Sequence, residues 1–410
     1  MTRSHPSPAA RAARVRDRLE QLFALGSAPH ANRPGLGADE QRACELAAGW
    51  MRDAGLSVAW DAAGNLVGRR AGRDPSRAEV WLGSHLDTVP AGGRFDGALG
   101  VVAAIEAIES LPAPPAAGIA LWAFRDEEGW RFGRSCFGSR ALCGALEPGE
   151  LDGRDAGGVS VGEALRALGH VAPPPEGWLE PRPAAHLELH IEQGPVLAEA
   201  GVPLGVVIAI AGIAEGSVRF HGRRGHAGTT PMAGRADALR AASAYVEGVA
   251  TLAESLEQAV ATVGHVAVRP GAQNVIPDEA ELSLDLRAAG DSALRALRDG
   301  ARRLAGEAAA AHGCRAEFEL RWTTPPVPMD HDVRAVLRDA VARAGAPVLE
   351  LPSGAGHDAG VLAAAGIPTG MLFVRSLAGG ISHAPEEDSA TGDVAVALTA
   401  LADALGALTG

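Results

Sequence analysis

The spacing of apolar and polar positions divides the first part of the chain into alternating helices and strands. Residues 11–25 and 38–54 have the pattern of helices, and the second is closed by Gly55. Short apolar runs bounded by turn residues predict strands at 80–83, 119–124, 186–191 and 206–210. Between the first two of these runs, residues 97–111 are predicted to form a helix. This alternation predicts an α/β architecture with a mainly parallel sheet.

The pattern changes near Gly212. Runs that alternate between polar and apolar residues predict strands at 217–222, 265–270, 280–287 and 316–322, with helices at 235–257 and 292–311. This β-α-β-β-α-β order, within about 110 residues, is typical of a small ferredoxin-like domain with one open sheet face. The α/β pattern resumes at Asp330. We therefore predict a large catalytic α/β domain, residues 1–211 and 328–410, with an inserted α+β dimerisation or lid domain, residues 212–327.

Composition and charge restrict the classes of partner. The chain has 410 residues, of which 47% are hydrophobic, and this is enough for two domains with sizeable cores. Its formal net charge of -13 offers no broad basic face, so nucleic acid and anionic membranes are not expected partners. We find no apolar run approaching the roughly 18 residues of a membrane span and no signal peptide. The four cysteines form no CxxC pair, which argues against a disulfide framework or a zinc knuckle. A cytoplasmic enzyme is expected.

Histidine and carboxylate side chains gather where predicted strands of the large domain end. In chain order, these candidates are His85, Asp87, Asp96, Glu127, Glu128, His190 and His383. All lie at or just after the ends of strand-like runs except Asp96, which lies in a Gly-flanked turn that begins a helix. The carboxyl ends of parallel strands share one edge of a sheet, so these groups are expected to converge. Imidazole and carboxylate together suit zinc or a similar divalent metal, and two metals about 3.5–4 Å apart require one carboxylate that touches both.

Each of these residues, taken alone, has a simpler structural interpretation. A single histidine at a strand end is more often a hydrogen-bonded structural residue than a ligand, and a Glu-Glu pair is usually a solvated face. Here the pair Glu127 and Glu128 follows a buried-looking strand, and it occurs together with the other groups. The combination therefore favours a metal site over coincidence.

Several sequence blocks carry a closer resemblance. They are GSHLDTVPAGGRFDGALGV, DEEGWRFG, HIEQGPVL, GHAGTTPM with RADAL after it, QNVIP, LDLR, SGAGHDA and SHAPEE, in order from about residue 80 to 390. In them the chain closely resembles the family of N-carbamoyl-L-amino-acid hydrolases, β-ureidopropionases and allantoate amidohydrolases. That family belongs to the co-catalytic dinuclear metallohydrolases related to aminoacylase and glutamate-releasing carboxypeptidases. The resemblance covers nearly the whole chain.

The resemblance implies a site with two divalent metal ions, zinc first, with manganese, cobalt or nickel as alternatives. The implied ligands are His85 and His190 on one ion, Glu128 and His383 on the other, and Asp96 on both. Glu127 would be the general base, and Asp87 would hydrogen-bond the other ring nitrogen of His85. Peptidase-like relatives carry a carboxylate where this chain has His190, which moves the expected substrate from a peptide to a ureido group. Because one carboxylate must face two ions, we also predict a strained cis peptide at Asp96–Gly97.

The same resemblance implies roles for residues outside the metal ligands. His226 and Asn274, both in the small domain, would stabilise the oxyanion; a loop histidine that caps its own turn is the alternative for His226. The residues implied to bind substrate are Gln193, His226, Asn274, Arg287 and Gly356. Arg287 would pair with the substrate carboxylate, which an acidic protein otherwise repels; the alternative is a surface arginine at a strand end. The resemblance also implies a homodimer built through the small domain.

The leading hypothesis is an enzyme that hydrolyses a terminal ureido group of a small carboxylate, releasing ammonia and carbon dioxide. N-carbamoyl-L-amino acids and allantoate remain alternatives, because both present a carboxylate beside a ureido nitrogen. A second hypothesis is an aminoacylase or dipeptidase with the same centre. A third is a non-catalytic binder of small molecules, against which Glu127 counts, since binding alone needs no base.

Overall fold

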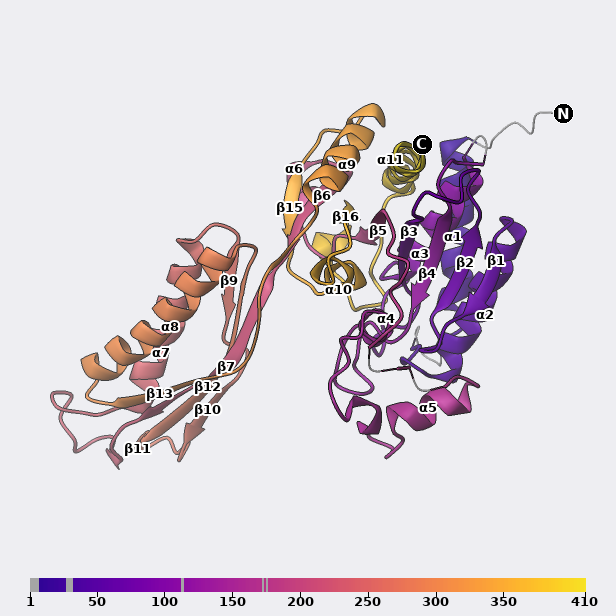
Figure 1. Ribbon diagram of the computed structural model, residues 1–410. Coiled ribbons are helices and arrows are strands. Elements are labelled where there is room, and N and C mark those ends of the chain that lie inside the picture. The colour runs from indigo at the N-terminus through magenta and orange to yellow at the C-terminus, as the bar shows by residue number, and fades with distance from the viewer. Residues whose placement is uncertain (1–6, 27–31, 112–113, 172, 175) are drawn as a thin grey trace. The chain divides into compact units, whose positions relative to one another are not determined.

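The chain divides into two compact units. The computed structural model describes residues 7–26, 32–111, 114–171, 173–174 and 176–410 (Figure 1). Unit 1 comprises Met1–Ile208, Pro328–Leu351 and Gly356–Gly410. Unit 2 comprises Ala209–Val327 and Pro352–Ala355, where the sequence suggested 212–327.

Unit 1 is built on a sheet with strand order β1-β2-β4-β3-β5-β16-β6-β14, and β15 pairs with β6. The strands are β1 (Ser57–Trp60), β2 (Leu66–Arg70), β3 (Val80–His85), β4 (Ile119–Phe124), β5 (Ala185–Ile191), β6 (Leu204–Ile210), β14 (Val327–Pro328), β15 (Glu350–Ser353) and β16 (Thr369–Val374). The central strands β4, β3, β5 and β16 are parallel, whereas β1, β2 and β6 pair antiparallel. The prediction of a mainly parallel sheet is confirmed.

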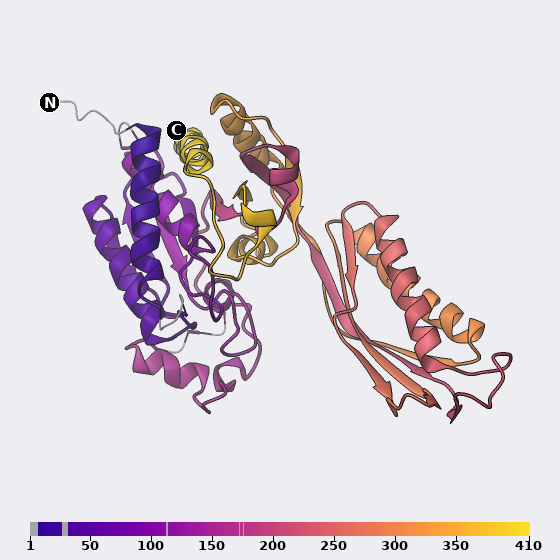
Figure 2. The ribbon, with the colours of Figure 1, turned by 180° about the vertical axis from the view of Figure 1, so that it is seen from behind.

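Helices cover both faces of this sheet, so its central strands are buried on both sides. The longer helices are α1 (Pro8–Phe23), α2 (Ala38–Asp53), α3 (Ala98–Glu109), α9 (His331–Arg343) and α11 (Thr391–Thr409), and the shorter ones are α4 (Phe137–Leu142), α5 (Val161–Ala167), α6 (Val196–Ala200) and α10 (Asp358–Ala364). In β3, Val80 and Leu82 join a core with the longer helices. Trp81, between them, packs with Leu142 of α4 and Leu362 of α10 on the other face. Figures 1 and 2 show the ribbon from opposite sides. Unit 1 is therefore a three-layer α/β structure.

Helix α11 corrects one expectation from the sequence. Its length and mean hydropathy of 1.4 would allow it to cross a membrane, although no such run was predicted. In the structure it packs against α1, α3 and α9. Its apolar side chains belong to the core of unit 1, namely Val394, Ala397, Leu398, Leu401, Ala404 and Leu405. The apolar sequence of α11 is thus accounted for by a buried core helix.

Unit 2 has the predicted ferredoxin-like connectivity. Its elements are β7 (Gly212–His221), β8 (Gly225–His226), α7 (Ala238–Glu254), β9 (Ala259–Thr262), β10 (Val266–Arg269), β11 (Val275–Ile276), β12 (Glu279–Ala288), α8 (Asp291–Ala311) and β13 (Arg315–Thr324). The antiparallel sheet has the order β10-β12-β7-β13, with β9 beside β12. Val218 and Phe220 of β7 pack with α7 and α8 in one core. Residues of β7 that alternate with them, such as Glu215 and Arg219, lie outside that core, so one face of the sheet is open.

The burial of one histidine predicts how the stability of the protein depends on pH. His186 of β5 is fully buried, and among the described residues neither ring nitrogen has a hydrogen-bond partner. Burial lowers the pKa of His186 to about 3. Below an unfolded-state pKa of about 6.5 the unfolded chain binds a proton that the folded chain does not, so the free energy of unfolding falls as the pH falls. Between pH 7 and pH 5 this one group removes about 2 kcal/mol.

Replacing His186 tests this pH dependence. The His186→Leu protein should lose about 2 kcal/mol less stability than the parent between pH 7 and pH 5, measured by urea unfolding at each pH. His265, an exposed histidine of unit 2, offers the matched control, and His265→Leu should follow the parent. Identical pH dependence in the parent and the His186→Leu protein would contradict the assignment.

Candidate metal centre

The candidate ligands meet at the carboxyl edge of the parallel strands. His85 ends β3, and His190 is the penultimate residue of β5. Glu128 lies just beyond β4, and His383 lies in the loop between β16 and α11. Asp96 comes from the turn before α3. The parallel order of β4, β3, β5 and β16 therefore brings together residues that are far apart in the sequence.

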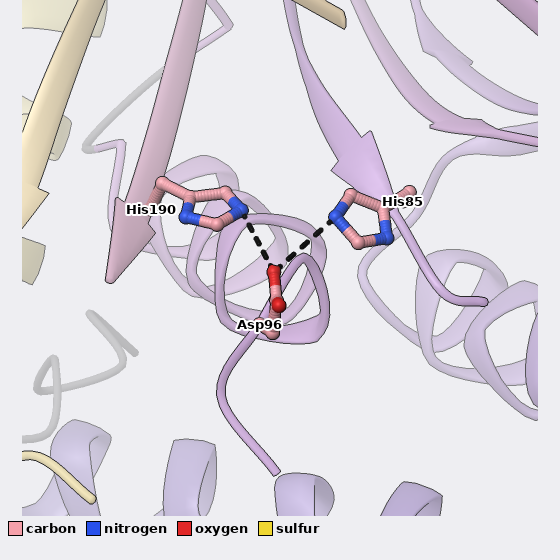
Figure 3. A group of neighbouring side chains, drawn as sticks. All are labelled: His85, Asp96 and His190. Carbon is pink, nitrogen blue, oxygen red and sulfur yellow. Dashed lines mark ion pairs between the residues drawn. The ribbon is translucent and has the colours of Figure 1, made fainter. Parts of the chain in front are cut away.

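The two oxygens of the Asp96 carboxylate face different groups. Oδ1 of Asp96 lies 3.5 Å from Nε2 of His85 and 3.3 Å from Nε2 of His190 (Figure 3). Oδ2 of Asp96 lies 3.2 Å from Nε2 of His383, and that nitrogen lies 3.5 Å from Oε2 of Glu128. The ligand atoms thus form two groups, each within 4.8 Å, that share Asp96.

These separations fit a pair of divalent cations. Around a tetrahedral zinc ion with ligands at about 2.0–2.1 Å, neighbouring ligand atoms lie about 3.3 Å apart. The observed distances between ligand atoms of 3.2–3.5 Å match this value. The imidazole and carboxylate donors also match the chemistry of zinc and similar metals. The residues therefore fit two ions, with Asp96 between them.

Backbone carbonyls orient two of the imidazoles. Nδ1 of His190 lies 2.9 Å from the carbonyl oxygen of Ile191, and Nδ1 of His85 lies 3.2 Å from that of Asp87. A neutral ring that donates its Nδ1 proton to a carbonyl directs the Nε2 lone pair toward the centre. Both histidines are thereby held in the tautomer that binds a metal through Nε2.

Asp87 supports the centre in a way that the sequence only partly indicated. Its Oδ1 lies 3.4 Å from Nδ1 of His85, as expected for a residue that orients the ring. In addition, Oδ1 and Oδ2 accept hydrogen bonds from the backbone N–H groups of Glu127 and Glu128, each at 3.1 Å. Asp87 therefore links the end of β3 to the loop that carries both glutamates.

Two further residues hold Asp96, and one of them was not predicted. Oε1 of Glu387 accepts hydrogen bonds from the N–H groups of Phe95 (2.8 Å) and Asp96 (2.9 Å). Gln193, which the sequence suggested for substrate binding, donates from Nε2 to Oδ2 of Asp96 (3.0 Å) and to the hydroxyl of Ser382 (3.1 Å). The second glutamate of the SHAPEE block was the only sequence signal for Glu387.

The turn at Asp96 differs from the prediction. Among the described residues the cis peptide bonds are Glu180–Pro181 and Arg269–Pro270, so the cis bond predicted at Asp96–Gly97 is wrong. The chain turns instead at Gly97, which has a φ of 61°. A Cβ at Gly97 would lie 2.4 Å from three atoms of the His85 ring, so only glycine allows this approach.

Burial and neighbouring charges within the centre favour the binding of cations there. Burial raises the pKa of Glu127 well above its usual range. Burial, followed by the charge of Asp96, raises the pKa of Glu128 to about 8. The hydrogen bond to Asp96 raises the pKa of His383 to about 9. These carboxylates thus compete for positive charge, and divalent cations in place of protons would return them to the ionised state.

A third group of possible ligands lies beside the first. Its members are Glu188, His190 and His357, all buried. Glu188 already accepts hydrogen bonds from the hydroxyl of Ser84 (2.8 Å) and the N–H of Ala359 (2.9 Å). The ring of His357 lies 4.5 Å from that of His190, between centroids. His357 therefore adjoins a candidate metal ligand within unit 1, and Gly356, a predicted substrate residue, precedes it in the chain.

The structure brings His226 and Asn274 together within unit 2. β8 pairs with β11, and the N–H of Ala227 donates to the carbonyl oxygen of Asn274 (3.0 Å). Nδ1 of His226 accepts from the N–H groups of Gly228 (3.0 Å) and Thr229 (3.2 Å). Its proton is therefore on Nε2, so an exposed donor is available at this position. The histidine does cap its own turn, as the structural alternative required, and it remains a donor.

Arg287 is already engaged within unit 2. Its Nε and Nη2 donate to the carboxylate of Asp285 at 2.9 and 2.8 Å, and its Nη1 donates to the carbonyl oxygen of Gly354 at 2.7 Å. These bonds use three of the five N–H groups of a guanidinium. A substrate carboxylate would have to use the remaining two, a constraint that the sequence did not reveal.

The chain is similar to known proteins in both sequence and structure. The model of peptidase family M20/M25/M40 matches residues 81–407. An N-carbamoyl-L-amino acid amidohydrolase of Geobacillus stearothermophilus is 40% identical over 395 residues, covering 93% of this chain and 95% of its own. An allantoate amidohydrolase of Bacillus subtilis is 33% identical, covering 87% of each chain. A crystal structure of an amidase of the hydantoinase/carbamoylase family from Burkholderia multivorans is 33% identical, with a TM-score of 0.92, covering 97% of this chain and 98% of that one.

The hydrogen bonds to Glu387 predict an effect on metal affinity. Glu387→Gln removes the charge that holds the Asp96 turn, and metal binding should weaken about 10–100-fold, measured by titration with chelator-buffered zinc. Glu386, the exposed neighbour, supplies the matched control Glu386→Gln, which should bind zinc as the parent does. Unchanged zinc affinity in a folded Glu387→Gln protein would show that this residue does not support the centre.

Proposed function

Because this chain belongs to peptidase family M20/M25/M40, we propose that its amidohydrolase activity is directed at a terminal ureido group. The substrate would be a small carboxylate, such as an N-carbamoyl-L-amino acid or allantoate, and the products would be an amine, ammonia and carbon dioxide. The names of the amidohydrolases that are 33–40% identical over most of the chain support this class. The observation that carries the proposal is Asp96, which presents one oxygen to each of two ligand groups.

The proposed cofactor is a pair of divalent ions, with zinc as the first candidate and manganese, cobalt or nickel as alternatives. His85 and His190 would hold one ion, Glu128 and His383 the other, and Asp96 both. When bound, the ions supply Lewis-acid activation of the attacking water and of the scissile carbonyl.

Glu127 is the proposed general base. Its Oε2 lies 3.8 Å from Nε2 of His85, and its backbone N–H is fixed by Asp87. From this position the carboxylate takes a proton from the attacking water and delivers one to the departing nitrogen. The side chain is 9% exposed, so bulk water competes little for that proton.

Substrate-binding roles are proposed for residues of each unit. In unit 1, Gln193 donates to Asp96, and Gly356 precedes His357, whose ring lies 4.5 Å from that of His190. In unit 2, the Nε2–H of His226 and the amide of Asn274 would donate to the developing oxyanion. Arg287 would bind the substrate carboxylate through the two N–H groups that Asp285 and Gly354 leave free. We further propose a cytoplasmic homodimer built through unit 2, whose sheet has an open face and an edge to cover.

Substrate class is tested by ammonia release from the zinc-loaded protein. N-carbamoyl-L-amino acids and allantoate should be hydrolysed, whereas N-acetyl amino acids and dipeptides should yield no free amino acid above the rate of a chelated control. Turnover of acetyl or peptide substrates alone would replace the proposal with the aminoacylase or dipeptidase alternative. Zinc binding with no turnover of any substrate would indicate a binder.

Glu127 should act on the chemical step alone. We expect Glu127→Gln to lower kcat about 10²–10⁴-fold and to leave KM and zinc affinity within about twofold, because proton transfer is lost and the amide keeps the shape of the side chain. Steady-state kinetics with the best ureido substrate, together with zinc titration, measure both. A KM that rises as much as kcat falls would mean that Glu127 binds substrate instead.

Arg287 should act mainly through KM. Removing a charge-assisted pair costs on the order of 1.5–3 kcal/mol, so Arg287→Ala should raise KM about 10–150-fold for carboxylate substrates. Arg287→Lys should rescue poorly, because one ammonium cannot replace a planar fork. Arg219, an ion-paired arginine of the neighbouring strand β7, gives the matched control Arg219→Ala. Equal losses on a ureido substrate that lacks a carboxylate would make Arg287 structural.

A further inference from the structure

Glu127 has a neighbour to which the proposed chemistry assigns no role. The Sγ of Cys136 lies 3.7 Å from Oε1 of Glu127, within the range of a thiol hydrogen bond. The backbone N–H of Cys136 also donates to the carbonyl oxygen of Glu127 at 2.8 Å. Both side chains are buried, Cys136 with 5% exposure. One residue therefore contacts the proposed base through both its backbone and its side chain.

The backbone fixes the position of this thiol. Successive N–H groups of Cys136, Phe137 and Gly138 donate to the carbonyl oxygens of residues 127, 126 and 125 at 2.8–3.0 Å. The chain around Cys136 thus runs alongside the segment that leads into the glutamate pair. Cys136 itself has a φ of 57°, a left-handed conformation that is uncommon for residues other than glycine. Such a conformation persists where the surroundings enforce it, and it often marks a functional position.

The direction of the hydrogen bond follows from the surroundings. Burial, with the charges of Glu127 and Asp358 added to it, raises the pKa of the Cys136 thiol well above its usual range. The sulfur therefore keeps its proton and acts as the donor, and the carboxylate is the acceptor. The other carboxylate oxygen, Oε2, is the one that lies 3.8 Å from Nε2 of His85.

We propose that Cys136 is a positioning residue for Glu127, whose thiol holds Oε1 and so keeps Oε2 directed at the metal centre. This inference rests on the proposed function, because it assumes that Glu127 is the general base. Without the donor, the carboxylate can rotate about its last bond, and the oxygen that accepts the proton spends less time in place. The loss belongs to the chemical step, since the thiol has no proposed contact with substrate or metal.

The test compares donor-free and donor-retaining variants of the zinc-loaded protein. Cys136→Ala, and Cys136→Gly as a second variant that suits the left-handed backbone, should lower kcat about tenfold with KM within about twofold. Cys136→Ser, which keeps an O–H donor, should retain at least half of the parent kcat. Cys143, which caps the other end of α4, gives the matched control Cys143→Ala, with parent kinetics expected. In the Glu127→Gln background, Cys136→Ala should cause no further loss.

The outcomes separate this inference from the proposed function. Equal losses in the alanine and serine variants, a loss carried by KM, or a further tenfold loss in the Glu127→Gln background would overturn the positioning role. If the parent hydrolyses no ureido substrate, the proposed function fails, and crystal structures decide the inference. A rotated Glu127 carboxylate in Cys136→Ala, but not in Cys136→Ser, supports it; an unmoved carboxylate in both overturns it.

Discussion

The candidate site depends on the contacts that the Asp96 carboxylate makes with the other candidate ligands. Its oxygens face two groups of ligands, and every other candidate ligand is placed relative to it. The parallel strands bring those ligands to one edge of the sheet, and Gly97 allows the turn to approach the His85 ring. Burial and the neighbouring carboxylates raise the pKa values of Glu127 and Glu128, so positive charge among these groups favours their ionised forms. Unit 1 thus gathers at one sheet edge the residue groups that could hold metal ions.

A set of side chains around the ligands holds them in place, and most of its bonds run to the backbone. Asp87 accepts hydrogen bonds from the backbone N–H groups of Glu127 and Glu128. Glu387 accepts hydrogen bonds from the backbone N–H groups of Phe95 and Asp96. Charge-assisted bonds of this kind are stronger than neutral ones and fix loops that no helix or strand supports. Gln193 adds a hydrogen bond to Asp96 itself, and the proposed role of Cys136 is to hold the base in the same way. Catalysis by a positioned base requires its geometry to be held within about 0.5 Å.

The sequence predicted the part of the site that depends on strand periodicity. His85, Glu128 and His190 follow buried apolar runs, and parallel strands must end together, so their convergence could be inferred. The bonds of Glu387 to the backbone N–H groups of the Asp96 turn could not be inferred, nor could the contact of the Cys136 thiol with Glu127, because contacts between residues apart in the sequence leave no local pattern. The sequence pattern also could not predict that Arg287 pairs with Asp285. Alternation shows that both face one side of β12, but not that they bind each other.

Anomalous diffraction from crystals grown with zinc would test the central claim most directly. The account predicts two peaks at the zinc edge per chain, both within about 2.0–2.2 Å of an Asp96 oxygen, one beside His85 and His190 and the other beside Glu128 and His383. A single peak at full zinc occupancy, or two peaks of which only one touches Asp96, would contradict it.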